Sequence, residues 1–272
     1  MQLTEEQLTQ YRNSGFVFLP GHFSQDEVQA MRDTLPTLFA EASPRRVLEK
    51  DGVTVRSLHG SHRHVPLFES LVRDPRLLGA AEGILGDSLY VHQFKINSKR
   101  AFGGDQWAWH QDFIFWERED GIRNPDLVTA ALFLDEVNEF NGPLVLIEGS
   151  HKEGVIDVAP STGKPSQYDE MPEWISNLTA DIKYSVPRQK VESLSRAGQL
   201  VAPKGPSGSV LLFHPNLVHG SASNISPFDR SVVLVTYNRS VNAPVPGAGK
   251  QRPDFLCERD CTPIGAAVAQ AG

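Results

Sequence analysis

Five short segments between residues 89 and 237 constrain the fold most strongly, because each has the length and apolar pattern of a single β-strand. They span residues 89–97, 127–134, 143–147, 209–213 and 231–237. Turn-forming sequences such as Asn141-Gly142-Pro143 and Gly205-Pro206 separate them. Strands of this kind, without a helix between each pair, predict a β-sandwich or barrel.

Helices are predicted before these strands. Capping boxes TEEQ, from residue 4, and SQDE, from residue 24, begin helices over about 4–13 and 24–39. A short strand is expected over 15–19, and a third helix from Asp74-Pro75 to Gly86. We therefore expect a single domain over residues 1–272, with N-terminal helices over about 1–87 and a β core over about 88–240.

Residues 152–204 interrupt this pattern. The segment is polar, rich in Pro, Ser, Lys and Glu, and contains a predicted helix around 173–180. An insertion of this length in a compact β domain is usually a functional lid or a disordered segment. We favour a lid-like insertion over about 152–204.

Composition excludes several classes of function. The formal net charge is −7 and there is no long basic run, so nucleic acid and anionic membranes are not expected partners. No run of 18 apolar residues is present, and the polar N-terminus is not a signal peptide. The only cysteines, Cys257 and Cys261, are expected to be free thiols in a reducing cytoplasm. The sequence leaves the oligomeric state open.

The segment WAWHQDFIFW, residues 107–116, places a histidine and an aspartate among aromatic side chains. If the segment is a strand, His110 and Asp112 point to the same face. An imidazole and a carboxylate together suit a first-row divalent metal. A structural His–Asp hydrogen bond is the alternative.

A third ligand is available in residues 213–221, where His219 is the first candidate and His214 the second. Two histidines and one carboxylate form the facial triad of non-haem Fe(II) oxygenases. The histidines at 59, 62 and 64 lie in a polar segment and are expected at the surface or in a pocket lining. Arg230 enters an apolar strand, so its charge requires an anion, either a bound carboxylate or an internal salt bridge.

Together, His110-x-Asp112, His219-Gly-Ser221 and Arg230 resemble the phytanoyl-CoA dioxygenase (PhyH) family of Fe(II)- and 2-oxoglutarate-dependent oxygenases. The resemblance extends to GFVFLP, NGPLVLIEGSH and SVLLFHPNLVHGS. HQFKIN, WHQDFIFWEREDG and NISPF are similar to the branch that hydroxylates free amino acids and ectoine, and the leucine-type enzymes look nearer. Where the ectoine branch has WHVEDGMP, this chain has WEREDGI from Trp116.

The resemblance implies a mainly β fold with flanking α-helices and a double-stranded β-helix (jelly-roll, cupin-like) core. It implies that His110, Asp112 and His219 bind Fe(II) and that Arg230 binds the distal carboxylate of 2-oxoglutarate, with O2 as the oxidant. Four further positions match the co-substrate pocket of the family: Asn97, Gln93, Thr129 and Ser221.

The expected reaction is hydroxylation of an unactivated aliphatic C–H bond of a small free L-amino acid of the leucine type, with release of succinate and CO2. Phe113 and Trp116 are candidates for the substrate chamber wall. Arg56, His59 and Arg252 are candidates for the substrate carboxylate, and Glu119 and Asp120 for its ammonium group. The alternatives are the same chemistry on an ectoine-like solute, a carrier-tethered amino acid or an acyl-CoA, and a non-catalytic metal-binding β-barrel.

Overall fold

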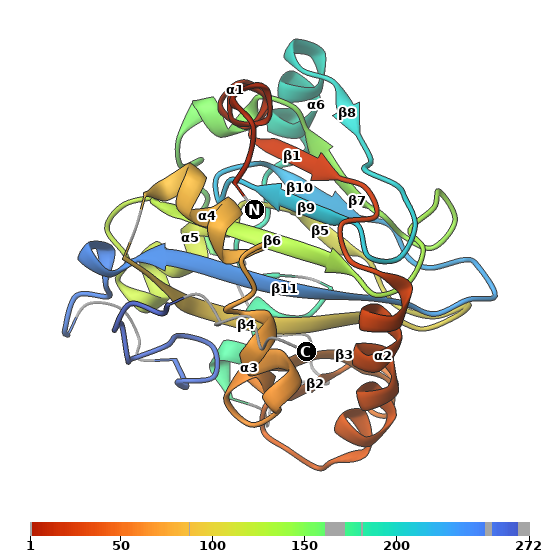
Figure 1. Cartoon of the computed structure of the whole chain (residues 1–272). Coiled ribbons are helices and arrows are strands. Elements are labelled where there is room, and N and C mark those ends of the chain that lie inside the picture. The colour runs from red at the N-terminus through yellow and green to blue at the C-terminus, as the bar shows by residue number, and fades with distance from the viewer. Residues whose placement is uncertain (1, 87, 161–171, 181, 248–251, 266–272) are drawn as a thin grey trace.

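Two antiparallel β-sheets form the centre of the molecule (Figure 1). The computed structural model describes all residues except 1, 87, 161–171, 181, 248–251 and 266–272. The major sheet has the strand order β1 (Phe16–Leu19), β9 (Val210–Phe213), β6 (Leu127–Phe133), β11 (Arg230–Arg239), β4 (Leu89–Lys99), β3 (Val55–His59) and β2 (Arg46–Leu48). The minor sheet has the order β5 (Trp107–His110), β10 (His219–Ser221), β7 (Leu144–Ile147) and β8 (Leu200–Val201). The predicted mainly β core with flanking helices is confirmed.

The N-terminal helices cover the outer face of the major sheet. Both predicted capping boxes are present, at α1 (Glu5–Ser14) and α2 (Gln25–Ala40). Two shorter helices follow, α3 (Pro66–Leu71), which was not predicted, and α4 (Leu78–Leu85), which ends at Gly86 as expected. No helix in the described part of the chain is long and apolar enough to cross a membrane.

Helix α4 begins at Leu78, later than the predicted start at Asp74-Pro75. Residues 74–77 form a turn that leads directly into the helix, because the Leu78 amide donates to the Asp74 carbonyl and the Gly79 amide donates to the Pro75 carbonyl. The Asp74 carboxylate accepts from the amide of Arg76 in the same turn.

Strand alternation divides the core into two layers. Val128, Ala130 and Leu132 of β6 pack with the helices in the outer cluster. Ala131 and Phe133 point to the opposite face and pack with residues of the minor sheet. Because a fully buried aliphatic or aromatic side chain contributes about 1.5–3 kcal/mol, this alternation fixes the face that each strand turns inward.

A β-bulge interrupts the alternation in β4, where plain alternation was expected. Thr236 of β11 is opposite Gln93, whereas Tyr237 is opposite Val91, so His92 is an extra residue. Before the bulge Val91 faces the outer cluster, and after it Phe94 does. The bulge therefore turns both His92 and Gln93 toward the interior.

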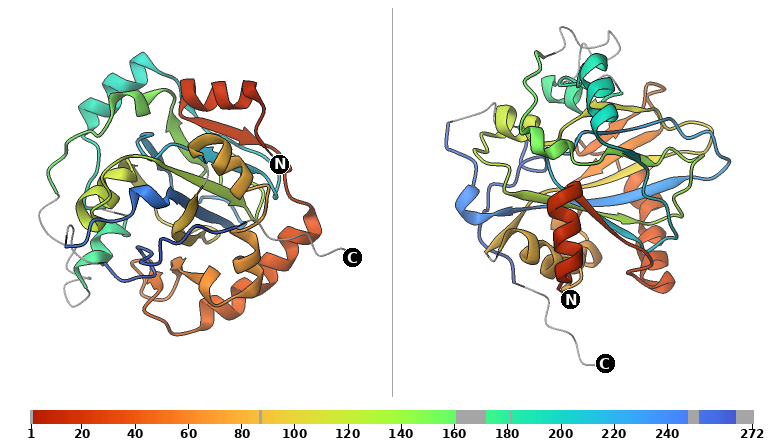
Figure 2. Two further views of the ribbon diagram at one scale, coloured as in Figure 1. Left: turned by 60° about the vertical axis from the view of Figure 1, so that its left-hand side comes forward. Right: turned by 90° about the horizontal axis from the view of Figure 1, so that it is seen from above.

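The insertion lies on the side of the two sheets opposite the N-terminal helices (Figure 2). Its described parts include η5 (Glu173–Asn177), α6 (Arg188–Ala197) and β8. The helix predicted around 173–180 is thus shorter than expected. Residues 161–171 and 181 of the insertion lie outside the described residues.

Candidate metal centre and substrate cavity

Three side chains predicted to bind metal converge between the two sheets. His110 ends β5 and His219 begins β10, and the two residues are direct partners in the antiparallel ladder. Their ring centroids are 4.1 Å apart, and His110 Nε2 lies 3.7 Å from Asp112 Oδ1. One ligand atom from each of the three residues lies within 4.8 Å of the others. The prediction that Asp112 lies in a strand with His110 was wrong, because Asp112 has a helical conformation just beyond β5.

Backbone carbonyls fix the tautomer of both imidazoles. His110 Nδ1 lies 2.7 Å from the Ala108 carbonyl, and His219 Nδ1 lies 2.9 Å from the Leu217 carbonyl. A carbonyl can only accept, so each Nδ1 carries the proton. Each Nε2 therefore keeps a lone pair that faces the other ligands.

The electrostatics also favour a cation between these groups. Burial, followed by the neighbouring His110, lowers the pKa of His219 to about 3, so its ring is neutral at pH 7. Burial would raise the pKa of Asp112, but the neighbouring Lys95 ammonium, 4.0 Å from Oδ1, opposes it and keeps that pKa below its usual range. Asp112 Oδ2 is buried and has no hydrogen-bond partner within the described residues. A donor set of two imidazoles and one carboxylate with an unused oxygen fits Fe(II).

His214, the second candidate for the third ligand, lies elsewhere. Its Nδ1 accepts from the Asn216 amide, and its ring is 5.2 Å from the ring of His151, near α1. The alternative of His214 as the ligand is therefore excluded by position.

Arg230 lies on the wall of the same cavity as the three ligands. Its side chain is buried, and Nε and Nη2 donate to the carbonyls of Asn141 and Gly142. No ion pair with a carboxylate holds Arg230 in the part of the chain that the structure describes, so the alternative of an internal salt bridge does not apply there. Burial lowers the pKa of Arg230 to about 10, so the guanidinium remains charged at neutral pH and can receive an anion.

The predicted co-substrate residues separate into two groups. Asn97, Gln93 and Ser221 line the cavity. Thr129 is fully buried behind the wall, where its hydroxyl lies 3.0 Å from that of Thr236. The prediction that Thr129 lines the pocket was wrong, because a cross-strand hydroxyl pair holds it inside the major sheet.

Among the predicted chamber walls, Trp116 lines the cavity and Phe113 does not. Phe113 packs behind the wall in an apolar cluster that includes Trp116, Ile114 and Leu127. The first residue after the metal-binding segment therefore contributes to packing.

Arg56 and His59 were predicted to contact the substrate, but both are buried behind the cavity wall. Arg56 pairs with Glu49, and its Nε donates to the Leu178 carbonyl at 2.9 Å. His59 is fully buried in β3, with Nε2 3.0 Å from Ser57 Oγ. The polar sequence around them gave no sign that both would be buried or that Arg56 would contact the distant Leu178 carbonyl.

Arg252 lines the cavity, as a residue that contacts substrate would. Its Nε and Nη2 bind the two carboxylate oxygens of Asp120 at 2.7 and 2.6 Å. Glu119 binds Lys183 and the Tyr184 hydroxyl, each at 2.7 Å. Both acidic candidates for the substrate ammonium group are thus already paired, and neither lines the cavity.

Lys95 was not among the predicted site residues, but it lines the cavity, and its Nζ lies 4.0 Å from Asp112 Oδ1. Lys95 lies two residues from both Gln93 and Asn97, so strand alternation places all three on the inward face of β4. This alternation could have identified Lys95 as a residue of the cavity. The insertion contributes Leu178 to the same wall.

The chain matches known proteins over most of its length. The sequence pattern of the family "Phytanoyl-CoA dioxygenase (PhyH)" matches residues 11–232. L-proline trans-4-hydroxylase from Streptomyces griseoviridis is 39% identical over 254 residues, covering 93% of this chain and 92% of that protein. Ectoine dioxygenase from Halomonas elongata is 37% identical over 262 residues, covering 93% and 76%.

Solved structures agree with these matches. EctD from S. alaskensis with bound Fe has a TM-score of 0.79 and 30% identity, covering 98% of this chain and 87% of that one. EctD with 2-oxoglutarate and 5-hydroxyectoine has a TM-score of 0.78 and 28% identity, covering 97% and 86%. The family match spans most of the chain and the relatives exceed 30% identity over nearly all of it, and the chain therefore belongs to the phytanoyl-CoA dioxygenase family.

Proposed function

We propose that this chain hydroxylates an unactivated aliphatic C–H bond of a small free L-amino acid, with Fe(II), 2-oxoglutarate and O2, and releases succinate and CO2. As a member of its family it is a 2-oxoglutarate-dependent dioxygenase. The observation that carries the proposal is a single cavity that combines three metal-binding side chains with Arg230, a buried cation that has only carbonyl partners among the described residues.

The metal would be held by Nε2 of His110, Nε2 of His219 and a carboxylate oxygen of Asp112. Bound Fe(II) would supply the activation of dioxygen for oxidation of the substrate. Arg230 would bind the distal carboxylate of 2-oxoglutarate, since a guanidinium matches a carboxylate in shape and charge.

The remaining residues would bind and orient the substrate and exclude water. Trp107, Phe115 and Trp116 provide apolar walls beside the ligands. Arg252 Nη1 has no partner within the described residues, so it can donate to a substrate carboxylate. A substrate held at one end presents a defined carbon to the oxidant, and orientation of this kind accounts for much of enzymatic rate enhancement.

The charges on the wall support a substrate with a carboxylate. Lys95, Arg230 and Arg252 line the cavity, whereas Asp112 is the only carboxylate among its described lining residues. The substrate ammonium group would therefore bind neutral oxygens. Gln93 offers one, because its Nε2 donates to the Leu256 carbonyl at 2.8 Å and leaves Oε1 as an acceptor.

Two relatives define the test. The proline hydroxylase supports a free amino acid, and the ectoine dioxygenases support ectoine as the second candidate. The purified protein, loaded with iron and 2-oxoglutarate, should be given L-leucine, other aliphatic L-amino acids, L-proline and ectoine in parallel. We expect substrate-dependent succinate and a product heavier by one oxygen atom with an amino acid. Turnover of ectoine alone would replace the proposal with the second candidate, and absence of any succinate would refute both.

A further inference from the structure

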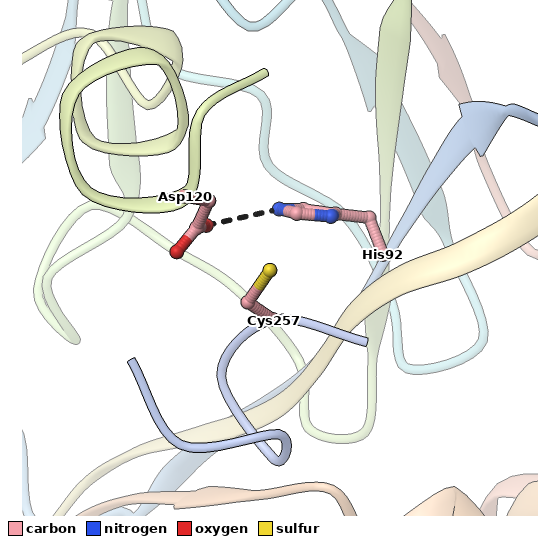
Figure 3. A group of neighbouring side chains, drawn as sticks. All are labelled: His92, Asp120 and Cys257. Atoms are coloured by element: carbon pink, nitrogen blue, oxygen red, sulfur yellow. Dashed lines mark hydrogen bonds and ion pairs between the residues drawn. The ribbon is translucent and has the colours of Figure 1, made fainter. Parts of the chain in front are cut away.

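Behind Arg252 lies a buried group that the proposed chemistry does not use, formed by His92, Asp120 and Cys257 (Figure 3). We propose that Asp120, supported by His92, is a positioning residue that fixes the Arg252 guanidinium and thereby the carboxylate of the substrate. This inference rests on the proposed function, because it assigns Arg252 to the substrate.

The contacts of Asp120 leave one edge of Arg252 available. Nε and Nη2 of Arg252 bind the two carboxylate oxygens, and the side chains are 3% and 0% exposed. Only Nη1 is left without a partner in the described chain, and Arg252 is one of the residues that line the cavity. A two-point ion pair therefore determines which nitrogen of Arg252 can meet a guest.

His92 supports Asp120 from the other side. Its Nε2 lies 3.2 Å from Asp120 Oδ2, and its side chain is 0% exposed. Val91 faces the outer cluster, so the imidazole of His92 faces the interior, and the bulge lets the next residue, Gln93, face the interior as well. The bulge therefore allows His92 to contact Asp120 while Gln93 lines the cavity.

The same network is connected to the cavity wall through η2 (Trp116–Asp120), a single π-helical turn that ends at Gly121 with φ 78°. Trp116, at its start, lines the cavity and packs edge-on against the His92 ring at 5.5 Å. Asp120, at its end, holds Arg252. π-Helical turns are rare and often occur at functional sites, and this one fixes an apolar wall and a cationic anchor together.

A second metal site is the competing interpretation, since His92, Asp120 and Cys257 each offer a ligand atom within 4.8 Å of the others. The contacts disfavour it. Both oxygens of Asp120 are bound to a guanidinium, which a metal cation would repel. Burial also raises the pKa of Cys257 to about 12, so the thiol stays protonated at neutral pH and is a poor ligand.

Four variants test the proposal: Asp120→Asn, Arg252→Gln, the double variant, and Cys257→Ser as a matched control in the same cluster. For the first two, we expect the substrate KM to rise roughly tenfold to a hundredfold, because misplacement by about 1 Å can cost that much. The KM for 2-oxoglutarate should stay unchanged, and more succinate should form per hydroxylated product. Cys257→Ser should match the wild type.

The double variant separates positioning from folding. Asp120→Asn leaves a buried charge without its partner and lowers stability, whereas the double variant is neutral and should recover much of the unfolding temperature. Its substrate KM should equal that of Arg252→Gln, because Asp120 acts only through Arg252. Additive effects on KM, or recovery of KM together with stability, would overturn the proposal.

A crystal structure of Asp120→Asn provides a readout independent of turnover. We expect Arg252 to leave its place on the cavity wall. An Arg252 that keeps its position would refute positioning by Asp120, whatever the substrate proves to be. Metal analysis after exposure to excess zinc tests the competing metal site. A second, tightly bound equivalent of zinc in the wild type that is absent from Cys257→Ser would establish that site instead. Failure of the wild type to hydroxylate any amino acid would refute the proposed function but not the structural result.

Discussion

Arg230→Ala is the most direct test of how the cavity receives 2-oxoglutarate. The guanidinium is buried, donates only to the carbonyls of Asn141 and Gly142 in the described chain, and remains charged below pH 10 because burial lowers its pKa only to about 10. Its remaining N–H groups can therefore receive the distal carboxylate of the keto acid.

The expected size of the effect follows from the chemistry of a buried charge pair. Removing one partner of such a pair costs ~2–5 kcal/mol. Since about 1.4 kcal/mol corresponds to a factor of ten, the 2-oxoglutarate KM should rise roughly 30-fold to 4,000-fold. The substrate KM at saturating 2-oxoglutarate should change much less.

The assay is succinate formation at varied 2-oxoglutarate, with Arg76→Ala as the control. Arg76 is ion-paired with Glu27 and Asp74 between α2 and α4, so its loss should lower stability without changing either KM. In the wild type, titration of Arg230 should not change the 2-oxoglutarate KM between pH 7 and 9. A guanidinium with a pKa of about 10 keeps its proton in that range and loses it only at higher pH. A 2-oxoglutarate KM in Arg230→Ala within threefold of the wild-type value would refute the assignment.

Three further substitutions test other parts of the structure. Asp112→Ala should abolish hydroxylation and the stabilisation that iron gives in thermal unfolding; metal content equal to that of the wild type would remove Asp112 from the ligand set. Ser24→Ala removes the side-chain cap of α2 and should cost ~1 kcal/mol in urea unfolding with unchanged kinetics; unchanged stability would contradict the role of the cap. Arg56→Gln weakens the contact with the Leu178 carbonyl, so the insertion should be cleaved faster by protease and the substrate KM should rise; protection equal to that of the wild type would show that Arg56 does not anchor it.

Local sequence was sufficient for features that depend on local chemistry. The capping boxes of α1 and α2 and the apolar strands of the β core were predictable because each is set by neighbouring residues. Residue type suggested His110, Asp112 and His219 as ligands but left His214 as an alternative, and the resemblance to the family chose among them. The roles of Asp112 and Arg230 remain predictions that the substitutions above test.

Features set by tertiary pairing were not predictable. The bulge at His92 exists only relative to the register of β11. Arg56 and His59 looked polar and accessible, but both are buried inside the fold, where Arg56 pairs with Glu49 and His59 Nε2 contacts the Ser57 hydroxyl. Lys95 was overlooked because a lysine in a strand usually points to solvent, and only the two-sheet arrangement places it beside Asp112.

The two carbonyls that fix the imidazole tautomers have a wider consequence. Each belongs to the residue two positions before its own histidine, Ala108 for His110 and Leu217 for His219. The choice of donor atom is thus built into the main chain and depends on no other side chain. Chamber residues other than Lys95, which neighbours Asp112, can therefore be exchanged to admit a differently shaped guest without changing the donor atom of either histidine, which makes selectivity and metal loading separable goals for engineering this scaffold.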